Sequence, residues 1–165
     1  MRADRDERVT RALAAAAPDL LGYFERRVTP SDAPDLVAEV MLAAWRRAAH
    51  LPDDPERARM WLFVTAHHVL SNAQRGERRR WRLANRLRMV VEPVEVPDPG
   101  EGAEVREAID ALSPDLAELV RLVHWDGLTL VEAAEVVGIP ASTARGRYQR
   151  AKADLRAALA VPVSD

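Results

Sequence analysis

The sequence predicts an all-α protein made of two small helical bundle domains joined by a flexible linker, with a helix-turn-helix in the second domain. Alanine, leucine and arginine dominate and β-branched runs are scarce, a composition that favours helices over sheets. Residues 91–102 hold three Pro and two Gly among acidic residues, which is typical of an extended linker. The remaining parts are each small enough for one bundle. We expect domains at residues 1–90 and 104–165, with the linker at 91–103.

Composition excludes several classes of protein. The chain has no Cys, so it has no disulfide framework, no thiolate nucleophile and no Cys-ligated metal. No apolar run approaches the roughly 20 residues that a bilayer span needs, and the N-terminus lacks the apolar core of a signal peptide. The four His are not spaced as one metal site, and no phosphate-loop, zinc-hydrolase or serine-hydrolase motif is present. We expect a cytoplasmic protein without membrane insertion, catalytic residues, metal or cofactor.

The charges are segregated although the net charge is only −2. Residues 56–88 hold nine Arg against two Glu, and residues 141–156 hold five basic residues against one acidic residue. The intervening residues 92–118 hold nine acidic residues against one Arg. All but one of the 24 basic residues are Arg, which binds phosphate in a bidentate fork and stacks on bases. The alternative is that the many Arg residues only reflect GC-rich coding. Their clustering instead favours two basic patches that face nucleic acid.

The first part of the chain predicts several helices. Residues 4–27 predict a helix pair that is broken near Pro18. A helix that opens at Ser31-Asp32 and closes before Pro52 follows from apolar residues at helical spacing, namely Leu36, Val37, Val40, Met41, Ala44, Trp45 and Ala48. After a loop over 50–56, a further helix starts at about Arg57 and becomes Arg-rich at its far end. Its predicted buried side consists of Met60, Trp61, Val64 and His68, together with Leu62 and Phe63.

The second part of the chain carries the signals of a helix-turn-helix. Ser113-Pro114-Asp115 predicts a helix start with a hydroxyl cap and Pro at the first helical position. Thr129 and Glu132 form a capping box, which predicts the start of a short helix. Gly138 then marks a turn before a longer basic helix that runs to about Leu159. A short helix, a Gly turn and a longer basic helix make a helix-turn-helix.

The last helix divides into a core stripe and an outward face. The predicted core stripe consists of Ala144, Tyr148, Ala151 and Leu155. The opposite face holds Ser142, Thr143, Gly146, Gln149, Arg150 and Ala153, with Arg145, Arg147 and Lys152 on its flanks. Ser, Thr, Gln and Arg can read base edges, and flanking cations suit phosphates. Gly146 lowers the stability of the helix by about 1 kcal/mol relative to Ala. Either a close approach of DNA compensates for this loss, or the helix tolerates it. The alternative for the whole face is a solvated basic surface.

Two parts of the chain resemble the two regions of extracytoplasmic-function (ECF) sigma factors of bacterial RNA polymerase, in the sigma-70 family. Residues 35–45 (DLVAEVMLAAW) and 61–72 (WLFVTAHHVLSN) are similar to region 2, and residues 111–152 are similar to region 4. The two matches follow in order around the linker and cover most of the chain. The resemblance implies a protein that is not an enzyme but binds core RNA polymerase, directs it to promoters and supports their opening.

The resemblance also implies which residues make each contact. Core polymerase is expected to bind Asp35, Glu39 and Leu42, with Ala38 where the family has Gln. The −10 promoter element is expected at His68, Asn72, Arg75, Arg78, Arg79, Arg80 and Arg82. The −35 element is expected at Ser142, Thr143, Arg145, Gly146, Arg147, Gln149, Arg150 and Lys152. Trp81 is a stacking candidate, Trp61 is expected in the core, and His67 has a packing or surface role.

The resemblance implies an anti-sigma factor as a further partner. Two other functions remain open at this point. The chain could be a stand-alone helix-turn-helix regulator that binds operators without polymerase. It could also be a degenerate sigma-like scaffold that binds only protein partners, because Ala38, Gly146 and Asp115 depart from the pattern of the family.

Overall fold

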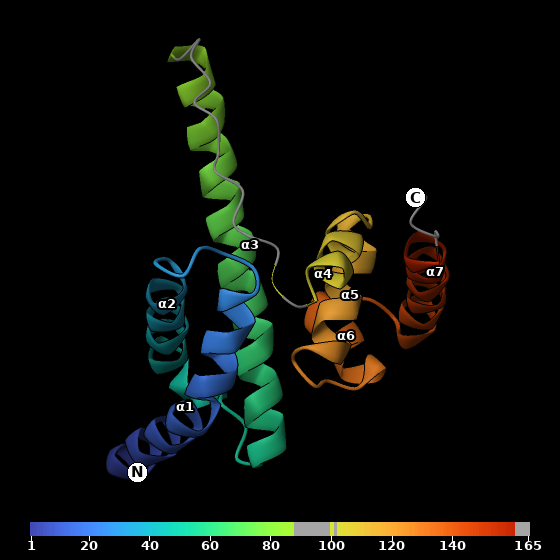
Figure 1. The fold of residues 1–165 in the computed structure, drawn as a ribbon. Coiled ribbons are helices and arrows are strands. Elements are labelled where there is room, and N and C mark those ends of the chain that lie inside the picture. The colour runs from blue at the N-terminus through green and yellow to red at the C-terminus, as the bar shows by residue number, and fades with distance from the viewer. Residues whose placement is uncertain (88–99, 101, 161–165) are drawn as a thin grey trace. The chain divides into compact units, whose positions relative to one another are not determined.

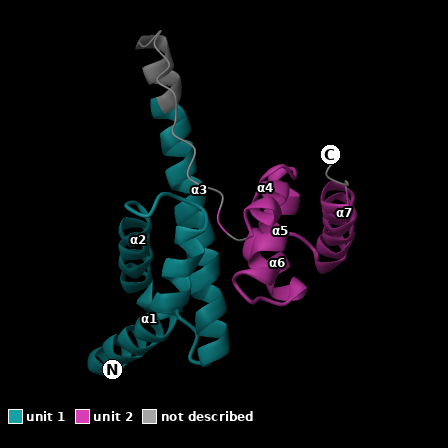
Figure 2. Ribbon diagram, viewed as in Figure 1, with its two compact units in different colours: residues 1–90 teal, residues 91–165 magenta. Residues whose placement is uncertain are grey.

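The computed structural model describes residues 1–87, 100 and 102–160, with side chains in the first range as far as Arg80. These residues form seven α-helices and one 3₁₀ turn, without any strand (Figure 1). The chain divides into two compact units, residues 1–90 (unit 1) and 91–165 (unit 2), as Figure 2 shows. The predicted all-α fold with two bundles is therefore confirmed. Most of the predicted linker lies outside the described residues.

Unit 1 is a bundle of three helices that all pack against one another, α1 (Arg2–Glu25), α2 (Ala33–Arg46) and α3 (Pro55–Leu87). A 3₁₀ turn at Ala48–His50 leads from α2 towards α3. The centre of the bundle is aromatic. The ring of Tyr23 meets the rings of Phe24 and Phe63 edge-on, at centroid distances of 5.2 and 5.9 Å. All three side chains are fully buried, so they fix how α1 packs on α3.

The predicted break near Pro18 is wrong, because α1 continues through this residue as one helix. Pro18 is exposed, whereas Leu13, Leu20 and Phe24 are buried on the opposite side of the helix. An interior Pro removes one helical hydrogen bond at a cost of about 3 kcal/mol. The apolar face that continues on both sides of Pro18 gains more than this by packing, so burial decides the outcome rather than local propensity.

Two predicted core positions lie at the surface. Trp45 is 42% exposed, and His68 is exposed as well. At about 100° per residue, Trp45 lies about 140° around α2 from Val40, which is fully buried. His68 lies about 140° from the fully buried Phe63 on α3. The buried face of α3 instead continues through Thr65, Ala66, Val69 and Leu70, while Trp61 and Val64 are half-buried.

Unit 2 contains four helices, α4 (Ala103–Asp110), α5 (Pro114–His124), α6 (Leu130–Val137) and α7 (Ala141–Leu159). Helix α7 packs against the other three. One core cluster consists of Ile109, Leu116, Ala117, Val120 and Ala151, with Leu112, Trp125 and Leu155 partly buried against it. Helix α4 begins at Ala103, the last residue of the predicted linker.

The ends of the helix-turn-helix follow from local chemistry. Thr129 Oγ1 accepts from the Glu132 backbone N–H, and Glu132 Oε2 accepts from the Thr129 backbone N–H, so the predicted capping box is confirmed. Gly138 ends α6 at a φ of 75°, in the left-handed region that favours glycine. The predicted hydroxyl cap at Ser113 is wrong, because the Ser113 side chain makes no cap bond and its carbonyl accepts from Leu116 and Ala117.

Replacing Thr129 by Ala is expected to destabilise unit 2 by about 1 kcal/mol, because the capping box loses its acceptor. The change is measured as a lower melting temperature of the transition that belongs to unit 2. Thr143→Ala is the matched control, because Thr143 is exposed inside α7 and Ala has the higher helix propensity. Equal melting temperatures for the two variants would contradict the role of the capping box.

Within the ranges that the structure describes, no helix combines the length and apolar character that a membrane crossing requires.

Candidate nucleic-acid and protein interfaces

The outward face of α7 presents the residue types that read DNA. Ala144 and Ala151, one heptad apart, are fully buried, and this stripe fixes how the helix is rotated. The exposed side therefore carries Ser142, Thr143, Arg145, Gly146, Gln149 and Arg150. The face is polar and basic, and its side chains point away from the core of unit 2.

Two of the three flanking cations of α7, Arg147 and Lys152, contact other side chains. Arg147 Nη1 lies 3.5 Å from Asp115 Oδ2 on α5. Lys152 Nζ lies 5.1 Å from the centre of the Tyr148 ring. The Tyr148 hydroxyl in turn forms a 2.7 Å hydrogen bond with His124 Nε2 on α5. Arg147 and Lys152 are half-buried, so they are oriented by the bundle before any ligand binds.

Gly146→Ala is expected to raise the stability of unit 2 by about 1 kcal/mol, because Ala forms helix better than Gly. A Cβ at this position meets nothing within 4 Å, so the fold itself does not require Gly. The gain is measured by thermal unfolding. Gly138→Ala is the control, because a Cβ there also meets open space but the φ of 75° strains it. Stabilisation by both variants, or by neither, would contradict this prediction.

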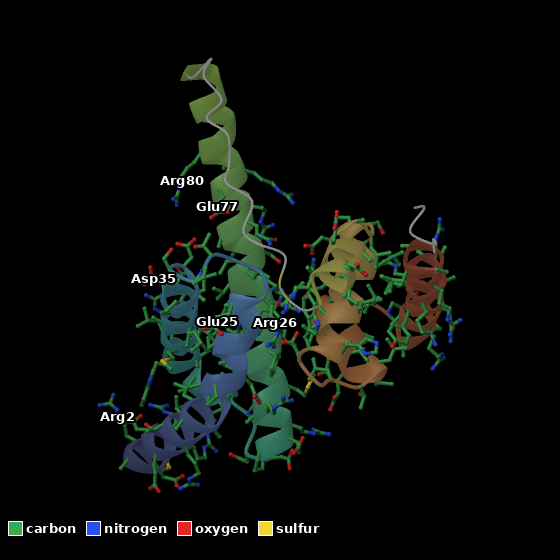
Figure 3. The ribbon with its side chains drawn as sticks, in the orientation of Figure 1. Arg2, Glu25, Arg26, Asp35, Glu77 and Arg80 are labelled. Atoms are coloured by element: carbon green, nitrogen blue, oxygen red, sulfur yellow. The ribbon has the colours of Figure 1, made fainter. Side chains whose placement is uncertain are left out.

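Helix α3 carries a second basic surface beyond the bundle core. His68, Asn72, Arg75, Arg78, Arg79 and Arg80 are all exposed. Arg75 donates to Asn72 Oδ1 at 2.5 Å, so these two side chains are held together one turn apart. Figure 3 shows Arg80 projecting away from its helix. The side chains of Trp81 and Arg82 lie outside the described residues.

The loop before α3 is anchored at three points. Leu51 is buried in the core of unit 1. Asp53 forms an ion pair with Arg8 of α1, and Asp54 Oδ1 accepts from the Arg57 backbone N–H at 2.9 Å. The second of these bonds caps the start of α3. The loop therefore has a defined conformation next to the basic helix.

The outward face of α2 combines acids with exposed apolar side chains. Asp35, Glu39 and Leu42 follow at spacings of four and three, so they share one side of the helix, and Asp35 projects outward in Figure 3. Leu42 is 55% exposed, and Trp45 lies three residues further on. We call these four residues the α2 patch. The sequence analysis placed Trp45 in the core stripe with Leu36 and Val40, although its angle from Val40 signals the surface.

Comparison with known families follows the same division. Residues 13–80 match the family model of sigma-70 region 2, and residues 102–155 match that of sigma-70 region 4. The ECF RNA polymerase sigma factor SigF of Caulobacter vibrioides (strain NA1000 / CB15N) is 30% identical over 141 residues, which cover 84% of this chain and 78% of SigF. The chain belongs to the ECF sigma factors.

Further relatives of this ECF sigma factor agree over nearly the whole length. SigL of Mycobacterium tuberculosis, also an ECF RNA polymerase sigma factor, is 26% identical over 90% of this chain and 88% of SigL. The sigma factor RpoE in complex with the anti-sigma factor NepR, from Bartonella quintana, has a TM-score of 0.65 at 20% identity and covers 96% and 98% of the two chains. CnrH in complex with the cytosolic domain of CnrY has a TM-score of 0.64 at 26% identity, with 92% and 86% covered.

The family match assigns elements of this ECF sigma factor to regions. Region 2 spans the later part of α1, all of α2, and α3 as far as Arg80. Region 4 spans α4 to α6 and α7 as far as Leu155. The α2 patch and the basic surface of α3 therefore belong to region 2, while the outward face of α7 belongs to region 4. Across the described stretches of the chain, no group of three or more His, Asp and Glu side chains is placed to hold a metal ion.

Proposed function

We propose that this chain initiates transcription as an ECF sigma factor that binds core RNA polymerase, directs it to promoters with particular −10 and −35 elements and supports their opening. The observation that carries the proposal is that regions 2 and 4 follow in order in one chain and each has an exposed polar or basic face. The domains would be residues 1–90 and 104–165, with residues 91–103 as the linker. The protein would act in the cytoplasm by binding alone, and the polymerase would supply the chemistry.

Core polymerase would bind the α2 patch. Two exposed apolar side chains, Leu42 and Trp45, can leave water when a partner covers them, and Trp is enriched among residues that dominate binding energy. Asp35 and Glu39 add negative charge that steers a basic partner surface and fixes its register. The Ala at position 38 can donate no side-chain hydrogen bond, so the apolar part of the patch would carry more of the affinity.

The −10 element would be read by α3 as single-stranded DNA. An unstacked base needs a flat or hydrogen-bonding partner, which His68 and Asn72 can provide. Cations along the same helix would hold the backbone, and the exposed ones are Arg75, Arg78, Arg79 and Arg80. Arg82 is expected to extend this set.

The −35 element would be read by α7 in the major groove. Gln149 and Arg150 suit bidentate contacts with adenine and guanine edges, and Arg145 lies on the same exposed side. Ser142 and Thr143 lie at the N-terminal end of the helix, the end whose residues contact base edges in helix-turn-helix proteins. Gly146 leaves room for a close approach of the DNA, and Arg147 and Lys152 would hold phosphates on the flanks.

The two DNA-binding surfaces would depend on each other through the linker. A flexible chain of about a dozen residues spans about 20 Å on average. Once polymerase fixes one surface at its element, the other is present at a high effective concentration, so neither needs high affinity alone. Weak binding by the free chain is therefore part of the proposal.

An anti-sigma factor would hold the chain inactive. The RpoE structure is a complex with the anti-sigma factor NepR, and the CnrH structure is a complex with the cytosolic domain of CnrY. Their likeness to this chain covers most of its length, so we propose a partner of the same kind.

The proposal is tested by measuring duplex DNA binding by the free chain and by the chain mixed with purified core polymerase. We expect the free chain to be monomeric and to bind promoter fragments weakly, and specific binding to appear when core polymerase is added. Tight specific binding by a dimer without polymerase would favour the stand-alone regulator. Failure to associate with core polymerase at all would favour the protein-binding scaffold.

A further inference from the structure

Arg147 is placed differently from the other Arg residues of α7. Arg145 and Arg150 are exposed, whereas Arg147 is half-buried and turned towards the Asp115 carboxylate. The side chains of Arg147 and Asp115 line a groove between α4, α5 and α7. Arg150 and Asp154 line the same groove. The guanidinium therefore faces a carboxylate at the edge of the helix that is proposed to bind DNA.

The position of Asp115 does not depend on DNA. It lies in the first turn of α5, where the positive end of the helix dipole stabilises a carboxylate. It is 71% exposed, so it retains a large solvent-facing surface beside α7. The neighbouring first-turn residue Pro114 fixes the start of the helix. Asp115 is thus a stable negative charge within reach of a cation that would otherwise be available for phosphate.

A DNA phosphate and a carboxylate compete for the same guanidinium. Both accept two parallel hydrogen bonds from Arg, so a contact with one excludes the bidentate contact with the other. Binding of Arg147 to DNA must therefore either break the contact with Asp115 or bring phosphate close to a negative charge. Either event lowers the affinity of unit 2 for DNA.

We propose that Asp115 competes with DNA phosphate for Arg147 and thereby sets how weakly region 4 binds DNA. The inference rests on the proposed function, because it takes α7 as a DNA-binding helix. It adds a residue outside the recognition helix that determines affinity. The competition weakens the binding of the free chain to duplex DNA, while a complex that also carries the −10 contacts tolerates the loss.

The test measures binding of the full chain to a 20-bp duplex of random sequence, since phosphate contacts do not depend on sequence. All proteins carry Arg78→Ala, Arg79→Ala and Arg80→Ala, which replace exposed side chains of α3 and reduce DNA binding by unit 1. Asp115→Asn, Arg147→Ala and the double variant are compared in this background. Asp154→Asn is the matched control, because it removes the same charge from the same groove. Melting temperatures report whether each variant is folded.

We expect Asp115→Asn to raise the affinity for the duplex about two- to fivefold, because the change removes one exposed ion pair that competes with phosphate. Arg147→Ala lowers the affinity and reduces the salt slope by about 0.9, as for the loss of one phosphate contact. In the Arg147→Ala background, Asp115→Asn does not raise the affinity for the duplex.

Three results of the comparison between variants would overturn the inference. They are an unchanged affinity in Asp115→Asn, a gain that persists without Arg147, and an equal gain from Asp154→Asn. A background protein that binds no duplex at about 50 mM salt also overturns it, because Arg147 then has no phosphate to hold. None of these results bears on whether the chain binds core polymerase. The proposed function is therefore tested separately from this inference.

Discussion

Replacing Trp45 or Leu42 by Asp is expected to lower the affinity for core RNA polymerase at least about 30-fold. Buried aromatic and apolar anchors at the centre of an interface contribute about 2 kcal/mol or more each, and 1.4 kcal/mol corresponds to tenfold. An Asp at either position also places an unpaired charge in the buried interface. Because both side chains are exposed in the free protein, neither change opens a cavity in unit 1.

The loss is measured by titrating labelled chain with purified core enzyme, alongside the melting temperature of unit 1. Val105→Asp is the matched control, because it introduces the same charge at an exposed apolar residue of α4, outside the α2 patch. Full affinity in Trp45→Asp and Leu42→Asp would show that polymerase binds elsewhere. A control variant that loses as much affinity would show that added charge alone explains the effect.

Arg150→Ala is expected to weaken binding of the holoenzyme to its promoters by about 5- to 150-fold, with relaxed selection at one position of the −35 element. A bidentate contact of Arg with a guanine edge discriminates by about 1–3 kcal/mol, which corresponds to this range. The Arg150 side chain is exposed on the outward face of α7, and its fixed fork matches the two acceptors of guanine.

Selection of bound sequences from a randomised −35 element measures both effects. Arg156→Ala is the control on the same helix, because Arg156 is also exposed but lies about 120° around the helix from Arg150. Both substitutions should change the free energy of unfolding by less than about 0.5 kcal/mol. An Arg150→Ala holoenzyme with unaltered sequence preference would contradict the assignment of the outward face of α7 to base reading.

Helical spacing and end signals in the sequence predicted the all-α fold class. These predictions succeeded at positions where residues close together in the chain decide the structure. The capping box at Thr129 and the turn at Gly138 depend on residues close together in the chain, and the structure confirms both. The predicted core stripe of α7 is borne out by Ala144 and Ala151, which are fully buried, while Tyr148 is half-buried. These features need no knowledge of distant contacts.

Tertiary packing decided most of the predictions that failed, while the hydroxyl cap at Ser113 failed locally. The break at Pro18 was wrong because a continuous apolar face holds both halves of α1 in the bundle. Trp45 was assigned to the core because its apolar character outweighed its angle on the helix, yet neither α1 nor α3 covers that side of α2. The contact of Arg147 with Asp115 joins two helices and has no local signal. The roles of the contact residues stay predictions, since they depend on partners outside this chain.

The central claim is that this chain redirects core RNA polymerase to promoters of its own choice. Mapping of transcript 5′ ends on genomic DNA, with core enzyme alone and with core enzyme plus the full chain, tests it most directly. We expect a new set of start sites that share two sequence elements at fixed separation, and we expect these sites to be lost with Trp45→Asp. Identical start sites with and without the chain would contradict it.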